Sequence, residues 1–227
     1  MTRKKNSWRR MSGEAVLIIS SVFVAIALES AWQDRQNFLA AQGALGQMLE
    51  ELRQDRADLD EVLDEQHNLD STYRRVISWL ADPESLSEQE FGEAVIFLSY
   101  SNRTMYPRRS AWTTMVASGQ LQLLNNAELV TKLGDLHENL YLRLITNGNA
   151  YDKDLFTTMR ESVPRIWDYI EYRFLTLDAS EIARLRGELQ FIHYTWNQWY
   201  LEFLTEEYGA VLDELIADVD AYLVSHQ

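Results

Sequence analysis

The side chains that could carry chemistry are sparse in this sequence. It has no cysteine, which excludes thiolate nucleophiles and cysteine-ligated metal sites. A helical di-metal carboxylate site needs two Glu-x-x-His motifs, and the nearest match is a single Asp64-x-x-His67. His193 stands among aromatic residues with no catalytic partner at a readable spacing, so we expect a core histidine. Neither a Gly-x-Ser-x-Gly elbow nor a phosphate-binding glycine loop is present. The sequence therefore predicts a protein that is not an enzyme and that has no metal site and no cofactor.

Two other groups of residues allow a functional interpretation beside a structural one. The acidic run from Asp58 to Glu65 is not accompanied by the glycine turn of a calcium loop, so we expect a solvated helix face. Aromatic residues gather at 167–174 and at 194–200. They either line a ligand pocket or belong to the core, and their helical spacing favours the core.

The charge of the chain is unevenly distributed. The net charge is −14, although the first ten residues carry five bases and no acid. An acidic body repels phosphate groups, so nucleic-acid binding is not expected. Three arginines stand against this background as a candidate docking patch for an acidic partner or lipid headgroups, the alternative being solvated loop arginines. They are Arg103, Arg108 and Arg109.

An apolar run follows the basic arm of residues 1–10. Ala15–Leu28 carries no charge, and its flanks extend it to residues 11–32, about 33 Å as a helix, which matches a hydrocarbon core of about 30 Å. Ala25-Ile26-Ala27 resembles a signal-peptide cleavage site, but no helix breaker follows the run. We therefore expect a transmembrane helix over 11–32 that stays attached, with a cleaved signal peptide or a soluble helix as the alternatives.

The flanks of this span predict its orientation and its contacts. Positive charges before it keep the N-terminus in the cytoplasm and place residues 33–227 in the periplasm, so the span crosses a bacterial inner (cytoplasmic) membrane once. Ser21-x-x-x-Ala25 gives the span a small-residue face on which another helix can pack. Trp8 and Trp32 bracket it at the two interfaces. The bases of the topology signal are Arg3, Lys4, Lys5, Arg9 and Arg10.

Residues 33–82 are expected to continue the same helix as a stalk. Apolar residues recur seven apart from Phe38 onward and form a heptad-like stripe. Polar breaks at Asp55 and Gln66 favour packing on other helices of the same chain, with a parallel homodimeric coiled coil as the alternative. The small residues between 40 and 46 predict either a packing notch or a flexible joint.

The rest of the chain, residues 83–227, is expected to form an antiparallel helical bundle that packs on the stalk, so that the fold is all-α. Helix breakers are rare, with 9 glycines and 3 prolines. Asn147-Gly148-Asn149 predicts a kink or an end in one of the helices. Pro83 is expected to end the stalk helix. The predicted N-caps of later helices are Ser87, Ser110, either Asn125 or Asn126, and either Asp178 or Ser180. Gly119 is expected to end a helix in the left-handed conformation.

Two stretches resemble a bacterial family of uncharacterised single-pass membrane proteins. GEAVLIISSVFVAIALESAWQDRQ, followed by a charged stalk, is similar to that family's span, which opens with Glu and an aliphatic run and closes near a Trp. SAWTTMVASGQLQLLNNAEL is similar to its short helix, Ser-Gly turn and following capped helix. The likeness covers about residues 13–145, and Ser20 and Ser21 stand where the family usually has glycines. It implies an N-terminal anchor and a helical extracytoplasmic domain, and it implies no reaction.

Two functional hypotheses follow. The first is a non-enzymatic accessory or structural subunit, anchored in the lipid bilayer, that docks on or stabilises a larger membrane protein complex such as a photosynthetic or respiratory one. The second is an extracytoplasmic ligand-binding or sensor bundle that acts through a membrane partner, since only about ten residues lie on the cytoplasmic side. A stoichiometric protein partner favours the first hypothesis, and a bound small molecule favours the second.

Overall fold

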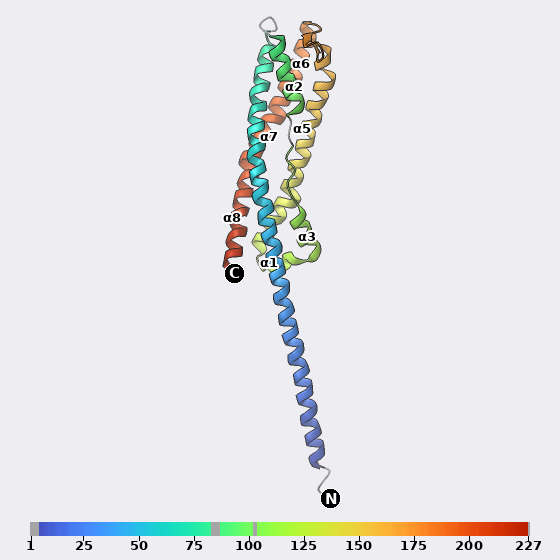
Figure 1. Cartoon of the computed structure of the whole chain (residues 1–227), viewed down its shortest axis with the longest axis vertical. Helices are drawn as coiled ribbons and strands as arrows, with labels where there is room; N and C mark the ends of the chain where they lie inside the picture. The colour runs from blue at the N-terminus through green and yellow to red at the C-terminus, as the bar shows by residue number, and fades with distance from the viewer. Residues whose placement is uncertain (1–4, 83–86, 102–103, 227) are drawn as a thin grey trace.

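The computed structural model describes residues 5–82, 87–101 and 104–226, with the backbone alone for residues 5–16 and Ile18. Helices account for nearly all of this part of the chain, which confirms the all-α class (Figure 1). The α-helices are α1 (Lys5–Trp79), α2 (Glu88–Tyr100), α3 (Ser110–Ser118), α4 (Ala127–Gly134), α5 (Tyr141–Glu161), α6 (Ala179–Ile192), α7 (Trp199–Glu202) and α8 (Gly209–Ser225).

Helix α1 is the spine of the molecule. It runs without interruption over 75 residues, about 110 Å at the usual helical rise. Its second half lies within the bundle, and its first half projects alone toward the N-terminus (Figure 1). The heptad-like stripe is buried against other helices of the same chain, so the intramolecular interpretation of the stripe is confirmed. Its buried apolar members are Ala41, Leu45, Met48, Leu52, Leu59, Val62, Leu69, Tyr73, Val76 and Leu80.

The small residues between 40 and 46 lie inside this uninterrupted helix. No described atom lies within 4 Å of a Cβ added at Gly43 or Gly46, apart from the helix's own backbone. The two glycines therefore do not make room for another part of the chain, whereas Ala41 and Leu45 of the same stretch are buried in the core.

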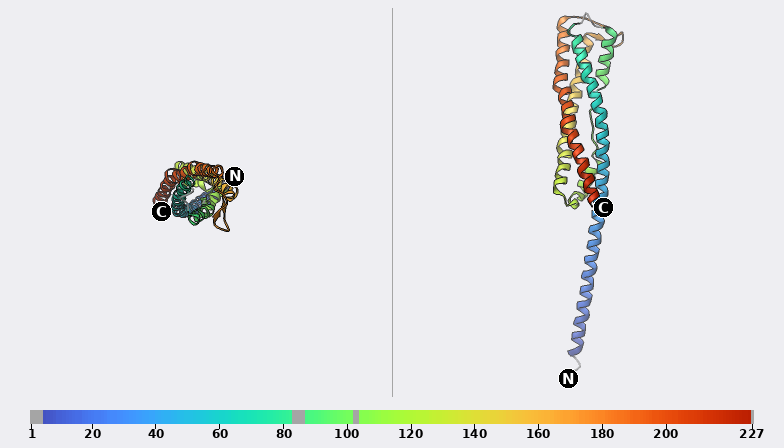
Figure 2. Two further views of the ribbon diagram at one scale, coloured as in Figure 1. Left: turned by 90° about the horizontal axis from the view of Figure 1, so that it is seen from above. Right: turned by 90° about the vertical axis from the view of Figure 1, so that its left-hand side faces the viewer.

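Two further helical rods complete the bundle around α1. Helices α4 and α5 are joined into one rod by a π-helical turn, and α6, α7 and α8 are joined into another by two such turns. Helix α8 runs along α1 and ends beside it where α1 leaves the bundle (Figure 2). A π turn inserts an extra residue and rotates the helix face that follows it. The π turns are Asp135–Leu140, His193–Gln198 and Phe203–Tyr208, with a 3-10 turn at Gln120–Leu124 and another at Val163–Arg165.

An extended strap, residues 104–109, runs through this helical bundle. Thr104 and Met105 are buried, and the Met105 N–H donates to the Tyr200 hydroxyl over 3.3 Å. The strap crosses α5 at Gly148, where an added Cβ would lie 2.4 Å from Thr104 Cγ2. The expected helix end near Gly148 is therefore wrong: α5 continues through it, and the glycine makes room for the strap.

Four helix ends carry the capping residue that the sequence predicts. They are the N-caps Ser87, Asn126 and Asp178 and the C-cap Gly119, whose φ is 70°. Ser110, in contrast, is the first residue of α3 rather than its cap. The Glu51 carboxylate on α1 instead accepts the Ala111 N–H at 3.1 Å and the Ser110 hydroxyl. A negative charge suits a helix N-terminus, but sequence spacing cannot show that it comes from another helix.

A short antiparallel hairpin, β1 (Trp167–Asp168) and β2 (Arg173–Phe174), lies at the end of the bundle farthest from the N-terminus (Figure 1). The sequence analysis does not predict this hairpin. The rings of Trp167 and Phe174 pack edge to face at 5.1 Å. Gly92 of α2 leaves room for them, since an added Cβ would lie 2.6 Å from Trp167. The first aromatic group thus contributes Trp167 to the core, but from a hairpin rather than from the helix that its spacing suggests.

The expected transmembrane helix over 11–32 falls on the projecting part of α1. Among the residues whose side chains are described, no helix is long and apolar enough to cross a membrane, so the structure does not support the anchor. The basic arm of residues 1–10 and the start of the span before Leu17 lie outside these described side chains.

Candidate functional site

Polar side chains on the inner face of α1 are the first candidates for a site, because a buried polar group is stable only when its partner is close. They lie at three levels: Asp55 and Gln66, which interrupt the apolar stripe, and Asp70, whose side chain is 22% exposed. Each of them bonds to a side chain that is far away in the sequence.

At the first level, the side chain of Asp55 is 0% exposed. Its carboxylate accepts hydrogen bonds from the Arg108 guanidinium at 2.8 Å, the Arg108 N–H at 3.1 Å and the Tyr141 hydroxyl at 2.9 Å. Burial raises the pKa of Asp55 above its ordinary value, although the bonds from Arg108 and Tyr141 act in the opposite direction. Arg108 also pairs with Asp58 at 2.8 Å. These contacts fasten the strap to α1 and to α5.

The candidate docking patch of arginines has partners inside the chain. Arg108 is held by Asp55, and Arg109 pairs with Glu138 at 3.2 Å. Arg103 lies outside the described residues. Neither interpretation of the sequence, a free docking patch or solvated loop arginines, anticipates these internal ion pairs. A partner that docks on Arg108 would have to break its ion pair with the buried Asp55 carboxylate.

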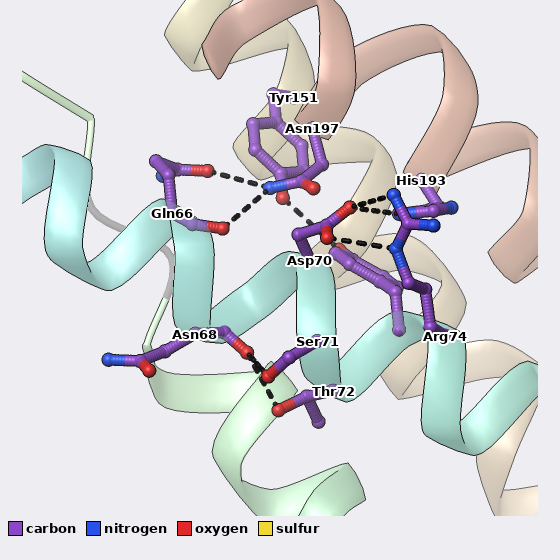
Figure 3. A network of polar contacts seen from close by, with 10 residues as sticks. Gln66, Asn68, Asp70, Ser71, Thr72, Arg74, Tyr151, His193 and Asn197 are labelled. Carbon is purple, nitrogen blue, oxygen red and sulfur yellow. Dashed lines mark hydrogen bonds and ion pairs between the residues drawn. The ribbon is translucent and has the colours of Figure 1, made fainter.

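Two polar rungs join α1 to the π turn His193–Gln198. Gln66 and Asp70, one helical turn apart, face Asn197 and His193, also one turn apart (Figure 3). Asn197 Nδ2 donates to Gln66 Oε1 at 3.0 Å, and His193 Nε2 lies 2.7 Å from Asp70 Oδ1. A slip of one helix along the other would separate both pairs in a low-dielectric interior. The rungs therefore fix the register of the C-terminal rod on α1.

The pair of Asp70 and His193 most resembles catalytic machinery. His193 is 4% exposed, and Asp70 is also bound by Arg74 at 2.9 Å. Burial acts to raise the pKa of Asp70, but the hydrogen bonds from Arg74 and His193 outweigh it and hold the pKa below its ordinary value. Asp70 lines a shallow cleft of about 360 Å³, in which the Thr205 hydroxyl donates to the Leu201 carbonyl. The geometry is that of a hydrogen-bonded core histidine, as expected for His193.

His137 is a second buried histidine, which sequence spacing does not single out. Its ring stacks on Trp112 at 4.9 Å and meets the Tyr141 ring edge-on at 4.8 Å. Neither ring nitrogen has a hydrogen-bond partner among the described residues. Burial lowers the pKa of His137 to about 4, and the positive charge of Arg109 acts in the same direction. The ring is therefore neutral at pH 7.

The acidic run contributes to ion pairs. Asp58 and Asp60 each pair with an arginine of the chain, so the run is only in part a solvated face. His67 Nδ1 lies 2.7 Å from the Leu63 carbonyl oxygen. Within the described residues, no group of three or more His, Cys, Asp or Glu side chains is arranged to hold a metal ion.

The second aromatic group, at 194–200, is divided among different environments. Tyr200 is buried in the core. Trp196 Nε1 donates to Asp154 at 2.7 Å, and the Trp199 ring stacks on Phe203 at 5.3 Å. These side chains pack against the bundle rather than around one pocket.

The predicted helix-packing face, Ser21 and Ala25, lies on the projecting part of α1 and is exposed. We call residues 17–37 of α1 the stem. Seven apolar side chains of the stem are between 51% and 71% exposed, and Trp32 is exposed as well. They are Leu17, Ile19, Val22, Phe23, Val24, Ile26 and Leu28. The side chains of Trp8 and of the five bases of the topology signal lie outside the description. The stem is thus an apolar surface that the chain does not cover itself.

The comparisons with known proteins give one match. A family model described as "Family of unknown function (DUF6090)" matches residues 14–181, which is most of the chain. No curated protein and no solved structure matches. The match agrees with the resemblance to an uncharacterised family and brings no reaction, ligand or partner with it.

Proposed function

We propose that this chain, which belongs to the DUF6090 family of unknown function, is a non-enzymatic subunit that α1 anchors in a bacterial inner membrane. In this proposal the span is residues 11–32, the bundle lies in the periplasm, and the chain docks on or stabilises a larger membrane protein complex. The observation that carries the proposal is the bare apolar surface of the stem.

A helix that exposes apolar side chains on every face needs an apolar environment. Full burial of a Leu, Ile, Val or Phe side chain contributes about 1.5–3 kcal/mol. Covering the seven exposed side chains of the stem would therefore contribute on the order of 10 kcal/mol. A bilayer covers all faces of a helix at once, whereas one partner helix covers a single face. We therefore favour a bilayer, with Ser21 and Ala25 facing a partner helix within it.

The internal polar contacts favour a structural role for the bundle. The bonds of Asp55, Gln66 and Asp70 join α1 to the strap and to the C-terminal rod. They hold the part of α1 from Ala41 to Trp79, about 57 Å long, in a fixed register against its neighbours. A stiff bundle on an apolar stem suits a spacer or brace within a membrane assembly.

Alkaline carbonate extraction of cells that express the full chain tests the membrane attachment. We expect the wild-type chain to stay in the membrane pellet. The double variant Phe23→Asp with Ile26→Asp should move to the supernatant, because an Asp near the centre of a span costs about 2.5–3.5 kcal/mol. The matched control is Leu142→Asp with Phe156→Asp, two positions of the bundle that are each 60% exposed. Release of the wild-type chain by carbonate would overturn the proposal.

Purification in mild detergent, followed by mass spectrometry, tests the partner. We expect a stoichiometric membrane protein to co-purify. Ser21→Leu with Ala25→Leu should lose this partner while the chain stays in the membrane, because large side chains prevent close helix contact. If this variant retains the partner, the span serves only as an anchor and does not bind the partner. A chain that purifies alone with a small molecule would favour the ligand-binding alternative.

A further inference from the structure

One end of the bundle is built from segments without charged side chains. Residues 36–49, 110–127 and 221–226 contain no Asp, Glu, Lys or Arg. A quarter of all residues are charged and the net charge is −14, although residues 15–28 and 189–201 are also without charged side chains. Three uncharged runs that meet at one end of an acidic molecule indicate a surface at which charged side chains are unfavourable. We call these three segments together the base.

The three segments of the base meet where α1 leaves the bundle (Figure 2). Gln42 Nε2 donates to the His226 carbonyl at 3.0 Å, and the rings of Phe38 and His226 lie 6.2 Å apart. The Tyr222 hydroxyl donates to the Leu124 carbonyl, which joins the third segment to the second. The uncharged runs are thus one continuous end of the molecule, adjacent to the stem.

The outer surface of the base is aliphatic and polar without charge. Leu39, Val116 and Val224, one residue from each segment, are 43%, 52% and 64% exposed. The other exposed positions between 113 and 127 are Thr, Ala, Ser, Gly, Gln and Asn. Burial in the core explains why inward-facing residues lack charge, but it does not explain the exposed ones.

We propose that the base rests on the lipid headgroup layer of the membrane that holds the stem. The inference rests on the proposed membrane attachment. With Trp32 at the interface, Leu39 lies about 10 Å further along α1. The headgroup region is about 5–8 Å deep on each face of a bilayer. The length of the stem therefore brings the base to the lipid surface without any further partner.

The charge distribution agrees with this occupant. Carboxylates are repelled by anionic lipids, and the repulsion is screened over about 8–10 Å at physiological salt. Glu50, the first carboxylate of α1 beyond the base, lies about 27 Å past Trp32 along the helix. The charges between the two are the adjacent opposite pair Asp34 and Arg35. An acidic bundle can stand on a bilayer with this arrangement, because Glu50 lies beyond the screening distance and the carboxylates next to the other two segments, Glu128 and Asp220, pair with Lys132 and Arg53.

Single-cysteine reporters test the inference, since the chain has no cysteine of its own. The full chain is reconstituted in vesicles of phosphatidylethanolamine and phosphatidylglycerol, and an environment-sensitive fluorophore is attached at one position at a time. We expect headgroup-labelled nitroxide lipid to quench Val116→Cys and Val224→Cys several-fold more than Ile170→Cys. Ile170 is the control because it is 88% exposed in the hairpin, at the opposite end of the bundle.

A fourth reporter separates failure of this inference from failure of the proposed function. Val24→Cys in the stem should be quenched by nitroxide on the lipid acyl chains. If Val24→Cys is quenched and Val116→Cys behaves like Ile170→Cys, the anchor stands and the base does not rest on lipid. If Val24→Cys is not quenched, the membrane attachment itself is wrong. A Val116→Cys fluorophore that is blue-shifted but not quenched by lipid would show a protein cover and would overturn the inference.

Charge placed in the base gives an independent check. Ala117→Glu with Gln122→Glu puts two carboxylates on its exposed surface. Quenching of the Val224→Cys reporter should then fall toward the value of Ile170→Cys, with the thermal unfolding midpoint unchanged. Quenching that is unaffected by the two carboxylates would contradict a contact with anionic lipid.

Discussion

Acidification should destabilise the bundle through His137. The ring is buried between Trp112 and Tyr141, and its pKa is lowered from 6.5 to about 4. The unfolded chain binds a proton at the ordinary pKa of 6.5. Between pH 6.5 and pH 4 the unfolded state therefore binds more protons than the folded state, so the free energy of unfolding falls as the pH falls.

The size of this effect follows from the two pKa values. Each pH unit between them corresponds to about 1.4 kcal/mol. The difference between 6.5 and about 4 therefore removes roughly 3 kcal/mol of unfolding free energy, which is fully present at pH 7 and lost at pH 4. This is a large share of the 5–15 kcal/mol by which most domains are stable.

Urea unfolding in detergent at several pH values between 7 and 4 measures the effect. His137→Phe keeps the aromatic contacts and removes the unpartnered nitrogens. The wild-type chain should lose about 3 kcal/mol relative to this variant between pH 7 and pH 4. Asp55 and Asp70 titrate in both proteins, so their contributions cancel in the difference.

His67→Phe is the matched substitution at an exposed histidine. Parallel curves for the wild-type chain and His137→Phe would refute the assignment of His137 as the destabilising group.

Four further substitutions have defined outcomes in denaturant unfolding at pH 7. Asp55→Ala should lower the free energy of unfolding by about 1–3 kcal/mol, because it leaves the buried Tyr141 hydroxyl and the Arg108 N–H without their acceptor; an unchanged free energy of unfolding would contradict these buried hydrogen bonds. Gly148→Ala should lose about 1–3 kcal/mol by collision with Thr104, whereas Gly187→Ala, with no described atom within 4 Å of the new Cβ, should gain up to about 1 kcal/mol; equal effects would refute the close crossing of the strap. Gly119→Ala should lose about 1 kcal/mol, because its φ of 70° is strained for alanine; an unchanged unfolding midpoint would argue against the left-handed C-cap.

Local features of the fold are readable in the sequence. The stripe on α1, the caps at Ser87 and Asn126 and the left-handed Gly119 all follow from interactions within a few residues or from helical periodicity. Such signals need no knowledge of tertiary structure, because the physical partners are close in the chain or share one helix face.

The features that the sequence does not reveal all depend on partners far apart in the chain. Asp55 interrupts the apolar stripe, and only the structure shows that Arg108 compensates it from the strap, 53 residues away. His193 finds Asp70 at a separation of 123 residues, through a π turn for which the sequence has no distinct signal. Gly148 suggests a helix break by its type, whereas its role is set by a strap that crosses it.

The stem is a different case, because the atoms that would cover its apolar side chains do not belong to this chain. An apolar run predicts burial, and the structure leaves these side chains exposed. Their cover is the environment of the protein, so the physical partner of the stem lies outside the fold.

The chemical accessibility of the stem in intact membranes is the most direct test of whether the stem lies within the bilayer. A single Val24→Cys chain, made in bacterial cells, is treated with a membrane-impermeant maleimide before and after the membrane is dissolved in detergent. We expect Val24→Cys to react only after detergent, while Ile170→Cys reacts from the periplasmic side of intact spheroplasts. Equal reaction of Val24→Cys with and without detergent would contradict a stem that lies within the bilayer.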